Sequence, residues 1–269
     1  MHVVVCVKQV PDTTQVRIDP ATNTLIREGV PAVVNPYDLY ALESALELQE
    51  RCGASVTLLS MGPPDAVKTL KKCLSYGADR AILLTDRAFA GADTWATSYA
   101  LAAAIRRLSQ EHRVDLVICG KQTIDGDTAQ TGPGIARHLG WQQCTCVERI
   151  TDVNHEAGSI TVERKLECGL ETVRTALPAV FTVVESAQPI RYAGLPALVR
   201  AARSIPEVWS AKELDVDPAC LGLKGSPTRV KKTFVPAQRS GGECVVTAEI
   251  GLRDAVASAV RVMESAELL

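Results

Sequence analysis

Short apolar runs alternate with longer amphipathic stretches through the first half of the chain. Runs rich in Val, Ile and Leu at 2–7, 55–60, 80–84 and 115–119 have the length of strands, and the first is apolar on both faces. Stretches with helical periodicity follow from 35, from 64 to 76 and from 94 to 109. Strands that alternate with helices build parallel sheets, so the pattern predicts an α/β fold with a doubly wound, mostly parallel sheet.

Several helix ends are marked by residue type. Asn35 is expected at the N-cap of the first helix, before Pro36 at its first position and Asp38 in its first turn. Asp93 is expected to cap the helix at 94–109, and Gly77 follows the helix at 64–76.

The sequence pattern changes beyond Gly140. Segments at 144–153, 159–168, 171–175 and 179–184 are β-rich and have no long helix between them. We expect them to extend the sheet with antiparallel strands, and a short hairpin is expected at 16–27. Residues 1–213 are therefore predicted to form one nucleotide-binding-type α/β domain, with a β-rich extension from about 141.

The chain from Leu214 onward is rich in Pro, Gly and Lys, so few contacts with its own core are expected. A last helix at about 251–266 carries an apolar stripe that includes Val256, Val260 and Met263. Residues 214–269 are predicted to form an extended arm and a terminal helix that docks on another subunit. A disordered appendage is the alternative.

Composition excludes several classes of protein. With 29 Lys and Arg against 31 Asp and Glu, the net charge is −2, which gives no footprint for nucleic acid or for an acidic membrane surface. The apolar runs are too short for a membrane span, and the N-terminus lacks an export signal, so a soluble, cytoplasmic chain is expected.

Catalytic and metal chemistry also find little support. The nine cysteines contain no Cys-x-x-Cys pair, and the four histidines are dispersed. No glycine loop is followed by Gly-Lys-Ser/Thr, which disfavours phosphoryl transfer. We assign no catalytic residue and no metal site.

One loop stands out chemically, at 120–132 directly after the strand at 115–119. Ligands of open α/β sheets bind at the carboxyl ends of strands, where the loops at 8–15 and 61–63 also lie. Glycines, hydroxyl side chains and the start of a helix at Pro133 suit a phosphate or pyrophosphate. Asp125 and Asp127 oppose this unless they point to ribose, backbone amides or solvent. A polar turn that caps the helix remains the other interpretation.

Six segments together resemble the β subunit of electron transfer flavoprotein. They read Cys-Val-Lys-Gln-Val-Pro-Asp at 6–12, Val-Asn-Pro-Tyr-Asp at 34–38, Gly-Ala-Asp at 77–79 and Gly-Lys-Gln-Thr-Ile-Asp at 120–125, with further matches at 162–180 and 191–196. The resemblance extends from residue 1 to about 235. It implies a Rossmann-like fold that binds an adenine nucleotide, and a heterodimer with an α subunit that carries its own FAD.

The resemblance also bears on the nucleotide of this subunit. In the AMP-holding branch the loop resembles Ile-Asp-Asp-Asp, whereas this chain has Ile124-Asp-Gly-Asp127. Gly126 and Ala129 remove side-chain volume and Thr128 adds a donor, which favours the electron-bifurcating branch with FAD in the β subunit and NADH as electron donor. Thr131 departs from the Val of many bifurcating relatives.

The resemblance places the nucleotide contacts on four parts of the chain. The expected contacts are Cys6, Asn35, Pro36, Tyr37, Asp38, Met61, Thr123, Ile124, Asp125, Gly126, Asp127, Thr128, Ala129, Gln130, Thr131, Gly132, Pro133 and Gly134. Leu195, in a turn between Gly194 and Pro196, is expected to dock on a partner flavoenzyme of the acyl-CoA dehydrogenase type. Ferredoxin or flavodoxin is the expected low-potential acceptor.

Two alternatives remain at this stage. One is a non-bifurcating electron carrier whose β subunit holds structural AMP. The other is a stand-alone adenine-nucleotide sensor similar to the universal stress proteins, which usually lack both the β-rich extension and the arm.

Overall fold

The computed structural model describes residues 1–12, 32–185, 189–232, 244 and 246–267. The described chain divides into two compact units, Met1–Lys231 and Lys232–Leu269, each of which is considered by itself. The hairpin expected at 16–27 lies outside the described residues.

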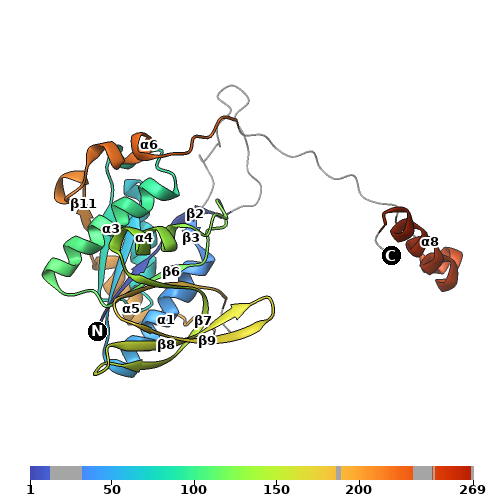
Figure 1. The fold of residues 1–269 in the computed structure, drawn as a ribbon, viewed down its shortest axis with the longest axis horizontal. Coiled ribbons are helices and arrows are strands. Elements are labelled where there is room, and N and C mark those ends of the chain that lie inside the picture. The colour runs from blue at the N-terminus through green and yellow to red at the C-terminus, as the bar shows by residue number, and fades with distance from the viewer. Residues whose placement is uncertain (13–31, 186–188, 233–243, 245, 268–269) are drawn as a thin grey trace. The chain divides into compact units, whose positions relative to one another are not determined.

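The first unit is built on a nine-stranded sheet (Figure 1). In spatial order its strands are β11 (Glu207–Trp209), β5 (Arg80–Leu84), β4 (Ser55–Met61), β1 (His2–Cys6), β6 (Leu116–Gly120), β10 (Ala179–Val183), β7 (Gln142–Asn154), β8 (Ser159–Leu166) and β9 (Gly169–Ala176). Neighbours from β11 to β7 pair in parallel. The predicted doubly wound, mostly parallel sheet is confirmed.

Two apolar cores cover the two faces of this sheet. One lies beneath α1 (Pro36–Cys52) and α2 (Val67–Leu74), and the other lies beneath α3 (Thr94–Glu111) and α4 (Thr131–Leu139). β1 contributes alternate residues to both cores and is fully buried, which explains why its sequence is apolar on both faces. The short elements η1 (Pro64–Ala66) and η2 (Arg87–Phe89) precede α2 and α3.

The predicted cap of α3 is confirmed. Asp93 Oδ1 accepts hydrogen bonds from the amides of Trp95 and Ala96 at 3.0 and 3.1 Å. A carboxylate at this position satisfies amides that the helix itself leaves unpaired. The local sequence was sufficient to locate this helix start.

The β-rich extension agrees with the prediction only in part. β7, β8 and β9 are antiparallel as expected. The segment at 179–184 was expected to join them, but β10 lies inside the parallel sheet between β6 and β7. All five of its residues are buried, because both helical layers cover it, and that environment favours its continuous apolar sequence.

The prediction that few contacts hold the chain from Leu214 onward is wrong for its first part. Leu214 and Leu221 are buried in the core beneath α3, and the amide of Asp217 donates to the Tyr99 hydroxyl at 2.9 Å. Thr228 donates to Asp93. The first unit therefore extends to Lys231 rather than 213, because apolar residues spaced between the Pro and Gly positions pack on α3.

Short elements occupy this part of the first unit. They are α5 (Leu195–Arg203), β11, η3 (Ala211–Glu213), η4 (Pro218–Cys220) and α6 (Gly222–Gly225). A separate two-stranded sheet joins β2 (Gln9–Pro11) to β3 (Ala32–Val34). The sequence pattern had indicated neither β11 nor this small sheet.

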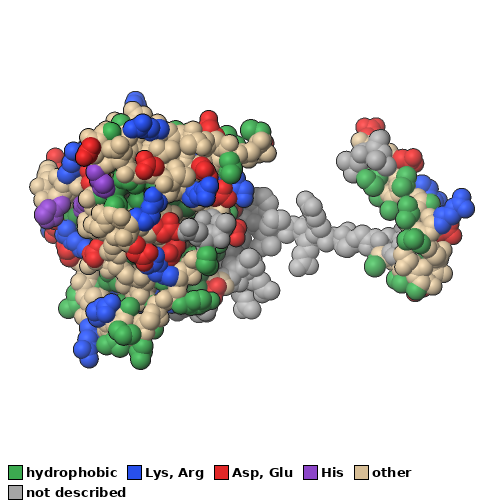
Figure 2. Space-filling view, turned by 90° about the horizontal axis from the view of Figure 1, so that it is seen from below, with side chains coloured by type: hydrophobic (Ala, Val, Ile, Leu, Met, Phe, Trp, Pro, Cys, Tyr) green, Lys and Arg blue, Asp and Glu red, His purple; other side chains and the backbone are tan. Residues whose placement is uncertain are grey.

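The second unit contains α7 (Thr247–Ile250) and α8 (Leu252–Ser265). Apolar side chains, Val256, Val260 and Met263 among them, are exposed on α8. Figure 2 shows hydrophobic side chains in green on the surface of this unit. In the part of the chain that the structure describes, no helix has the length and apolar character needed to cross a membrane.

Candidate functional site

Three segments from distant parts of the sequence meet at the carboxyl edge of the sheet. The Lys8 amide, just beyond β1, donates to Asp38 Oδ2 at 2.7 Å. The Asn35 amide donates to the Lys8 carbonyl at 3.0 Å, and its side-chain Nδ2 donates to the carbonyl of Gln122 at 2.9 Å. The start of α1, the end of β1 and the loop after β6 are therefore joined where the sequence placed its ligand crevice.

The loop after β6, residues 121–130, has a defined turn. The Thr123 carbonyl accepts hydrogen bonds from the amides of Gly126 and Asp127 at 3.3 and 3.0 Å. Asp127 and Ala129 adopt left-handed backbone angles, with φ of 49° and 54°. Non-glycine residues in this region carry a conformational cost that surrounding contacts must hold, and such residues are enriched at ligand-binding sites.

The two loop carboxylates that argued against a phosphate both have partners. Lys8 Nζ donates to the two oxygens of Asp125 at 2.7 and 2.9 Å, and Gln122 Nε2 donates to Asp127 Oδ1 at 2.8 Å. Partial burial alone would raise the pKa of Asp125, but the hydrogen bonds from Lys8 and Thr123 outweigh it and lower that pKa. The negative charge of Asp125 is thereby balanced within the chain.

The end of the loop presents donors. Within the described residues, the backbone amides of Thr128, Ala129 and Gln130 donate to no protein acceptor. α4 begins directly afterwards at Thr131, two residues before the predicted start, with Gln130 at its N-cap position. Free amides and the positive end of the helix dipole attract an anion.

The glycines of this region differ in their roles. A Cβ on Gly126 would touch only the Thr123 hydroxyl, at 3.4 Å, so this position is open. Gly132 was expected to let a ligand approach, but it is buried, and a Cβ there would collide with Thr182 of β10. Gly134 is likewise close to Ser98 of α3. Gly132 and Gly134 serve the packing of α4 against the sheet and α3.

The other predicted contacts lie around the same edge with different exposure. Cys6 and Cys119 are register partners at the ends of β1 and β6, and the hydrogen bond with Cys6, together with burial, raises the pKa of the Cys119 thiol. Met61 is half-buried at the end of β4, Tyr37 is half-buried, and Ile124 is 48% exposed. Pro36 and Thr128 are exposed, and Thr131 and Pro133 are half-buried.

Asn35 and Asp38 are polar residues that are nevertheless buried, at 0% and 5% exposure. Asn35 stands at the N-cap position of α1 as predicted, but its side chain makes no capping hydrogen bond. It contacts the loop and Asp38 instead. Desolvation raises the pKa of Asp38 to about 7, even though hydrogen bonds from Asn35 and backbone amides favour its ionised form.

Three residues lie in the predicted loops at 8–15 and 120–132 but were not among the expected nucleotide contacts: Lys8, Gln122 and Gly120. Lys8 and Gln122 engage the loop acids, and a Cβ on Gly120 would collide with Asp38 and Tyr37. Lys8 directly follows a buried strand that ends at this edge, which was the one available signal.

The predicted docking residue lies on a different surface. Leu195 is the first residue of α5 rather than part of a turn, and it is 73% exposed. Tyr192, just before it, is 98% exposed, and Leu198 and Val199 of α5 are also exposed. These four residues, which we call the α5 patch, are exposed apolar side chains within the stretch 192–199.

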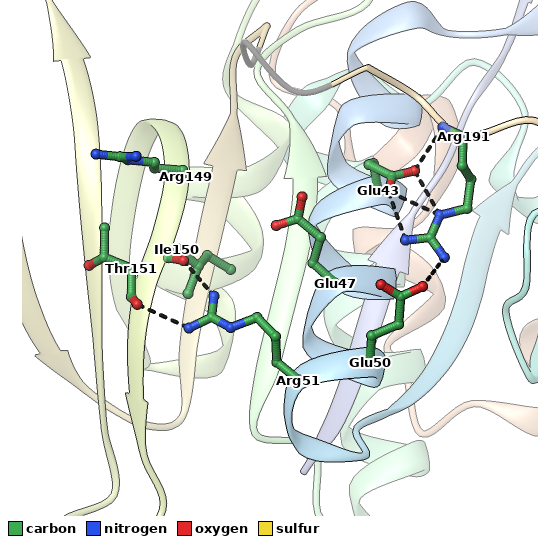
Figure 3. Close-up of a pocket in the computed structure, with 8 residues that line it drawn as sticks. All are labelled: Glu43, Glu47, Glu50, Arg51, Arg149, Ile150, Thr151 and Arg191. Atoms are coloured by element: carbon green, nitrogen blue, oxygen red, sulfur yellow. Dashed lines mark hydrogen bonds and ion pairs between the residues drawn. The ribbon is translucent and has the colours of Figure 1, made fainter.

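A salt bridge fixes the segment that leads into α5 (Figure 3). Arg191 donates from its amide and guanidinium to the carboxylate of Glu43 on α1, at 2.8 to 3.1 Å, and from Nη1 to Glu50 at 2.7 Å. The Glu43 side chain is only 10% exposed. The α5 patch therefore follows a point that is anchored to α1.

A surface pocket of about 680 Å³ surrounds this salt bridge, away from the predicted nucleotide residues. Its lining residues are Glu43, Glu47, Glu50, Arg51, Arg149, Ile150, Thr151 and Arg191. Arg51 donates to the carbonyls of Ile150 and Thr151, so most of the charged lining is already engaged within the chain. We do not assign a nucleotide to this pocket.

Comparisons with a family model and with individual proteins point to the same family. Residues 22–213 match the model of the electron transfer flavoprotein domain. The chain is 53% identical over 241 residues to protein FixA of Azotobacter vinelandii, covering 89% of this chain and 86% of the relative. It is 48% identical over 245 residues to electron transfer flavoprotein subunit beta of Clostridium acetobutylicum, with 91% and 92% covered. It is 44% identical over 246 residues, with the same shares covered, to subunit CarD of the caffeyl-CoA reductase-Etf complex of Acetobacterium woodii.

Proposed function

The chain belongs to the electron transfer flavoprotein family, as a β subunit, and from this premise we propose that its carboxyl-edge loop holds FAD and makes it an electron-bifurcating subunit. In this proposal NADH would be the hydride donor, and FAD held by this loop would be the acceptor. The two electrons would then be divided between the FAD of the α subunit, which would serve a flavoenzyme of the acyl-CoA dehydrogenase type, and ferredoxin or flavodoxin. The proton of the hydride would be released as the flavin is reoxidised.

One observation carries the nucleotide part of the proposal. Both acids of the loop, Asp125 and Asp127, are engaged by Lys8 and Gln122, while the amides of 128–130 donate to no acceptor in the part of the chain that the structure describes. A pyrophosphate therefore finds donors without an unpaired carboxylate beside it. Gly126 leaves open space beside the loop, which favours a dinucleotide. An aspartate at this position would place a side chain and a negative charge in that space.

The chain's own residues would bind and orient the nucleotide. The amides of Thr128, Ala129 and Gln130 and the hydroxyls of Thr128 and Thr131 would hold the pyrophosphate. FAD, when bound, supplies the hydride-accepting and electron-passing chemistry. The protein contributes position and charge balance, and none of its side chains is needed as an acid or base.

The α5 patch is proposed as the docking surface for the partner flavoenzyme. Leu195 is 73% exposed and stands next to Pro196 at the first turn of a helix, which limits its backbone freedom. A preorganised apolar side chain that enters a pocket contributes binding free energy without a large ordering cost.

The second unit is proposed to contact the α subunit. Among the described residues of this unit, the large apolar side chains of α8 are 37–72% exposed. Removing residues 237–269 should weaken the heterodimer and leave the first unit folded. An unchanged dissociation constant for the two subunits would contradict this role.

The experiment that tests the main proposal is a nucleotide count on the co-purified αβ complex. Acid extraction and chromatography should give two FAD per heterodimer, and NADH should bleach flavin absorbance under anaerobic conditions. One FAD plus one AMP would instead establish the AMP-holding carrier.

A further inference from the structure

Asn35 and Asp38 lie beneath the loop rather than on its surface. Asn35 is fully buried, and its Nδ2 donates to the Gln122 carbonyl and to Asp38 Oδ1, both at 2.9 Å. Its Oδ1 accepts the amide of Ile124 at 3.3 Å. One side chain thus contacts the loop at two points and α1 at a third.

Asp38 completes this network toward β1 and β6. Its Oδ2 accepts the Lys8 amide at 2.7 Å, and the Gly120 amide also donates to the carboxylate. Gly120 lies so close that a side chain there would collide with Asp38. The carboxylate is therefore surrounded by N–H donors from three segments.

We propose that the side chains of Asn35 and Asp38 act as positioning groups, a buried clasp that fixes the nucleotide loop to α1 and β1. The proposal rests on the proposed nucleotide-binding function, and it gives these two side chains a role in addition to the contacts that the family resemblance implied for residues 35–38.

Charge and burial support this role. The other titratable groups that face Asp38 are Lys8 beyond β1, Cys119 of β6 and Cys73 of α2. The hydrogen bond with Cys6, together with burial, raises the pKa of the Cys119 thiol, and burial raises the pKa of the Cys73 thiol, so both thiols are neutral. The Lys8 ammonium is bound to Asp125 rather than to Asp38. Burial of the Asp38 carboxylate therefore has a free-energy cost, and the hydrogen bonds from Asn35, Lys8 and Gly120 are the main interactions that offset it.

The clasp can be removed without removing the helix start. Asn35→Ser keeps a residue that is favourable at an N-cap, but its hydroxyl is too short to reach the Gln122 carbonyl. Asp38→Asn keeps the size of the side chain, but its NH₂ group would face at least one N–H donor and could not accept that hydrogen bond. Both variants therefore release the loop while the apolar contacts of α1 remain.

A matched control exists at the opposite edge of the sheet. Asp79 also accepts one backbone amide, from Val56 at 2.8 Å, and one side-chain amide, from Gln49 at 2.9 Å. Asp79→Asn removes the same kind of contact at the other end of α1. It should lower stability without reaching the loop.

The test is hydrogen exchange of the co-purified αβ complex freed of bound nucleotide. Backbone amides in 121–130 should exchange at least tenfold faster in Asn35→Ser and Asp38→Asn, with β1 and β6 unchanged. After titration with FAD and with AMP, the tighter-binding nucleotide should lose at least tenfold in affinity. Asp79→Asn should change neither readout by more than about twofold.

Three results would overturn the clasp. Unchanged loop exchange in both variants is one, and faster exchange spread equally over the loop, β1 and β6 is the second. The third is weaker nucleotide binding with an unaltered loop, which would mean direct contact. If the parent complex binds neither nucleotide, the proposed function fails, while the exchange measurement still decides whether the loop is held.

Discussion

Helix α1 carries two buried acids that anchor different surfaces by different means. Asp38, in its first turn, is held by neutral N–H donors, and burial raises its pKa to about 7. Glu43, farther along, is held by the Arg191 guanidinium and anchors the segment that leads to the α5 patch. We call Asp38 with its N–H donors the loop anchor, and Glu43 with Arg191 the α5 anchor. The loop anchor should respond to pH near neutrality, whereas the α5 anchor should respond to loss of its counter-ion.

The largest expected effect comes from adding a third acid to the loop. Gly126→Asp places a charge beside two carboxylates whose partners are already used, so the FAD affinity of the β subunit should fall at least about 100-fold and NADH oxidation should stop. Flavin content and NADH oxidation rate measure this.

Gly126→Ala is the matched control for that variant. Its methyl group would touch only the Thr123 hydroxyl at 3.4 Å, so both flavins should remain. If Gly126→Asp also keeps two flavins and full activity, position 126 does not select the nucleotide.

The next effect concerns the α5 anchor. Arg191→Ala leaves Glu43 buried without a counter-ion, which should cost about 3 kcal/mol of unfolding free energy and slow electron delivery to the partner flavoenzyme. Nucleotide content should stay unchanged. Denaturant unfolding and partner-reduction rates measure the two effects.

Arg149→Ala provides the comparison for Arg191. Arg149 pairs with Glu163 on the surface, where its side chain is 61% exposed and solvent screens the pair, so its loss should lower the free energy of unfolding far less than the loss of Arg191. Equal losses in the two variants would mean that burial of Glu43 adds nothing to the α5 anchor.

A smaller effect should appear as a pH dependence of the loop anchor. The pKa of Asp38 is higher in the folded chain than its ordinary value of 3.8, so between about pH 4 and pH 7 the folded state binds more protons than the unfolded state. Its contribution to stability is therefore complete at low pH and is lost as the pH rises through about 7.

The free energy of unfolding should be measured for nucleotide-free complexes of the parent and of Asp38→Asn at pH 5 and at pH 8. Between these two pH values the parent should lose about 2 kcal/mol more unfolding free energy than Asp38→Asn does. A constant difference between the two proteins across this range would show that Asp38 ionises at its ordinary pKa.

The smallest effect concerns the α5 patch itself. Leu195→Ala should weaken binding of the partner flavoenzyme by about 1 to 2 kcal/mol, because an exposed apolar side chain loses the pocket it fills. Leu170→Ala, at a residue 61% exposed in β9, is the control and should bind normally. Loss of flavin in Leu195→Ala would contradict a docking role.

Local patterns were sufficient for much of the fold. The apolar run of β1, the cap at Asp93 and the loop directly after β6 all follow from neighbouring residues, because strand alternation, helix periodicity and capping act over a few positions. The α/β class and the edge that carries the loop could therefore be predicted.

The remaining features depend on residues far apart in the sequence. The antiparallel prediction for 179–184 was wrong, because only the packed sheet decides that β10 enters between β6 and β7. Likewise, Leu214 and Leu221 look like parts of a loose arm until the α3 face is there to bury them.

The site shows the same division. By itself the sequence determined that Asn35, Asp38 and the loop at 120–132 would be polar groups near strand ends, and motif resemblance supplied the family. Only the tertiary structure decided that Lys8 pairs with Asp125 and that Asn35 contacts Gln122 instead of capping its helix. Hydrogen bonds between segments depend on where the packed sheet brings the strand ends together, and no local pattern encodes that position.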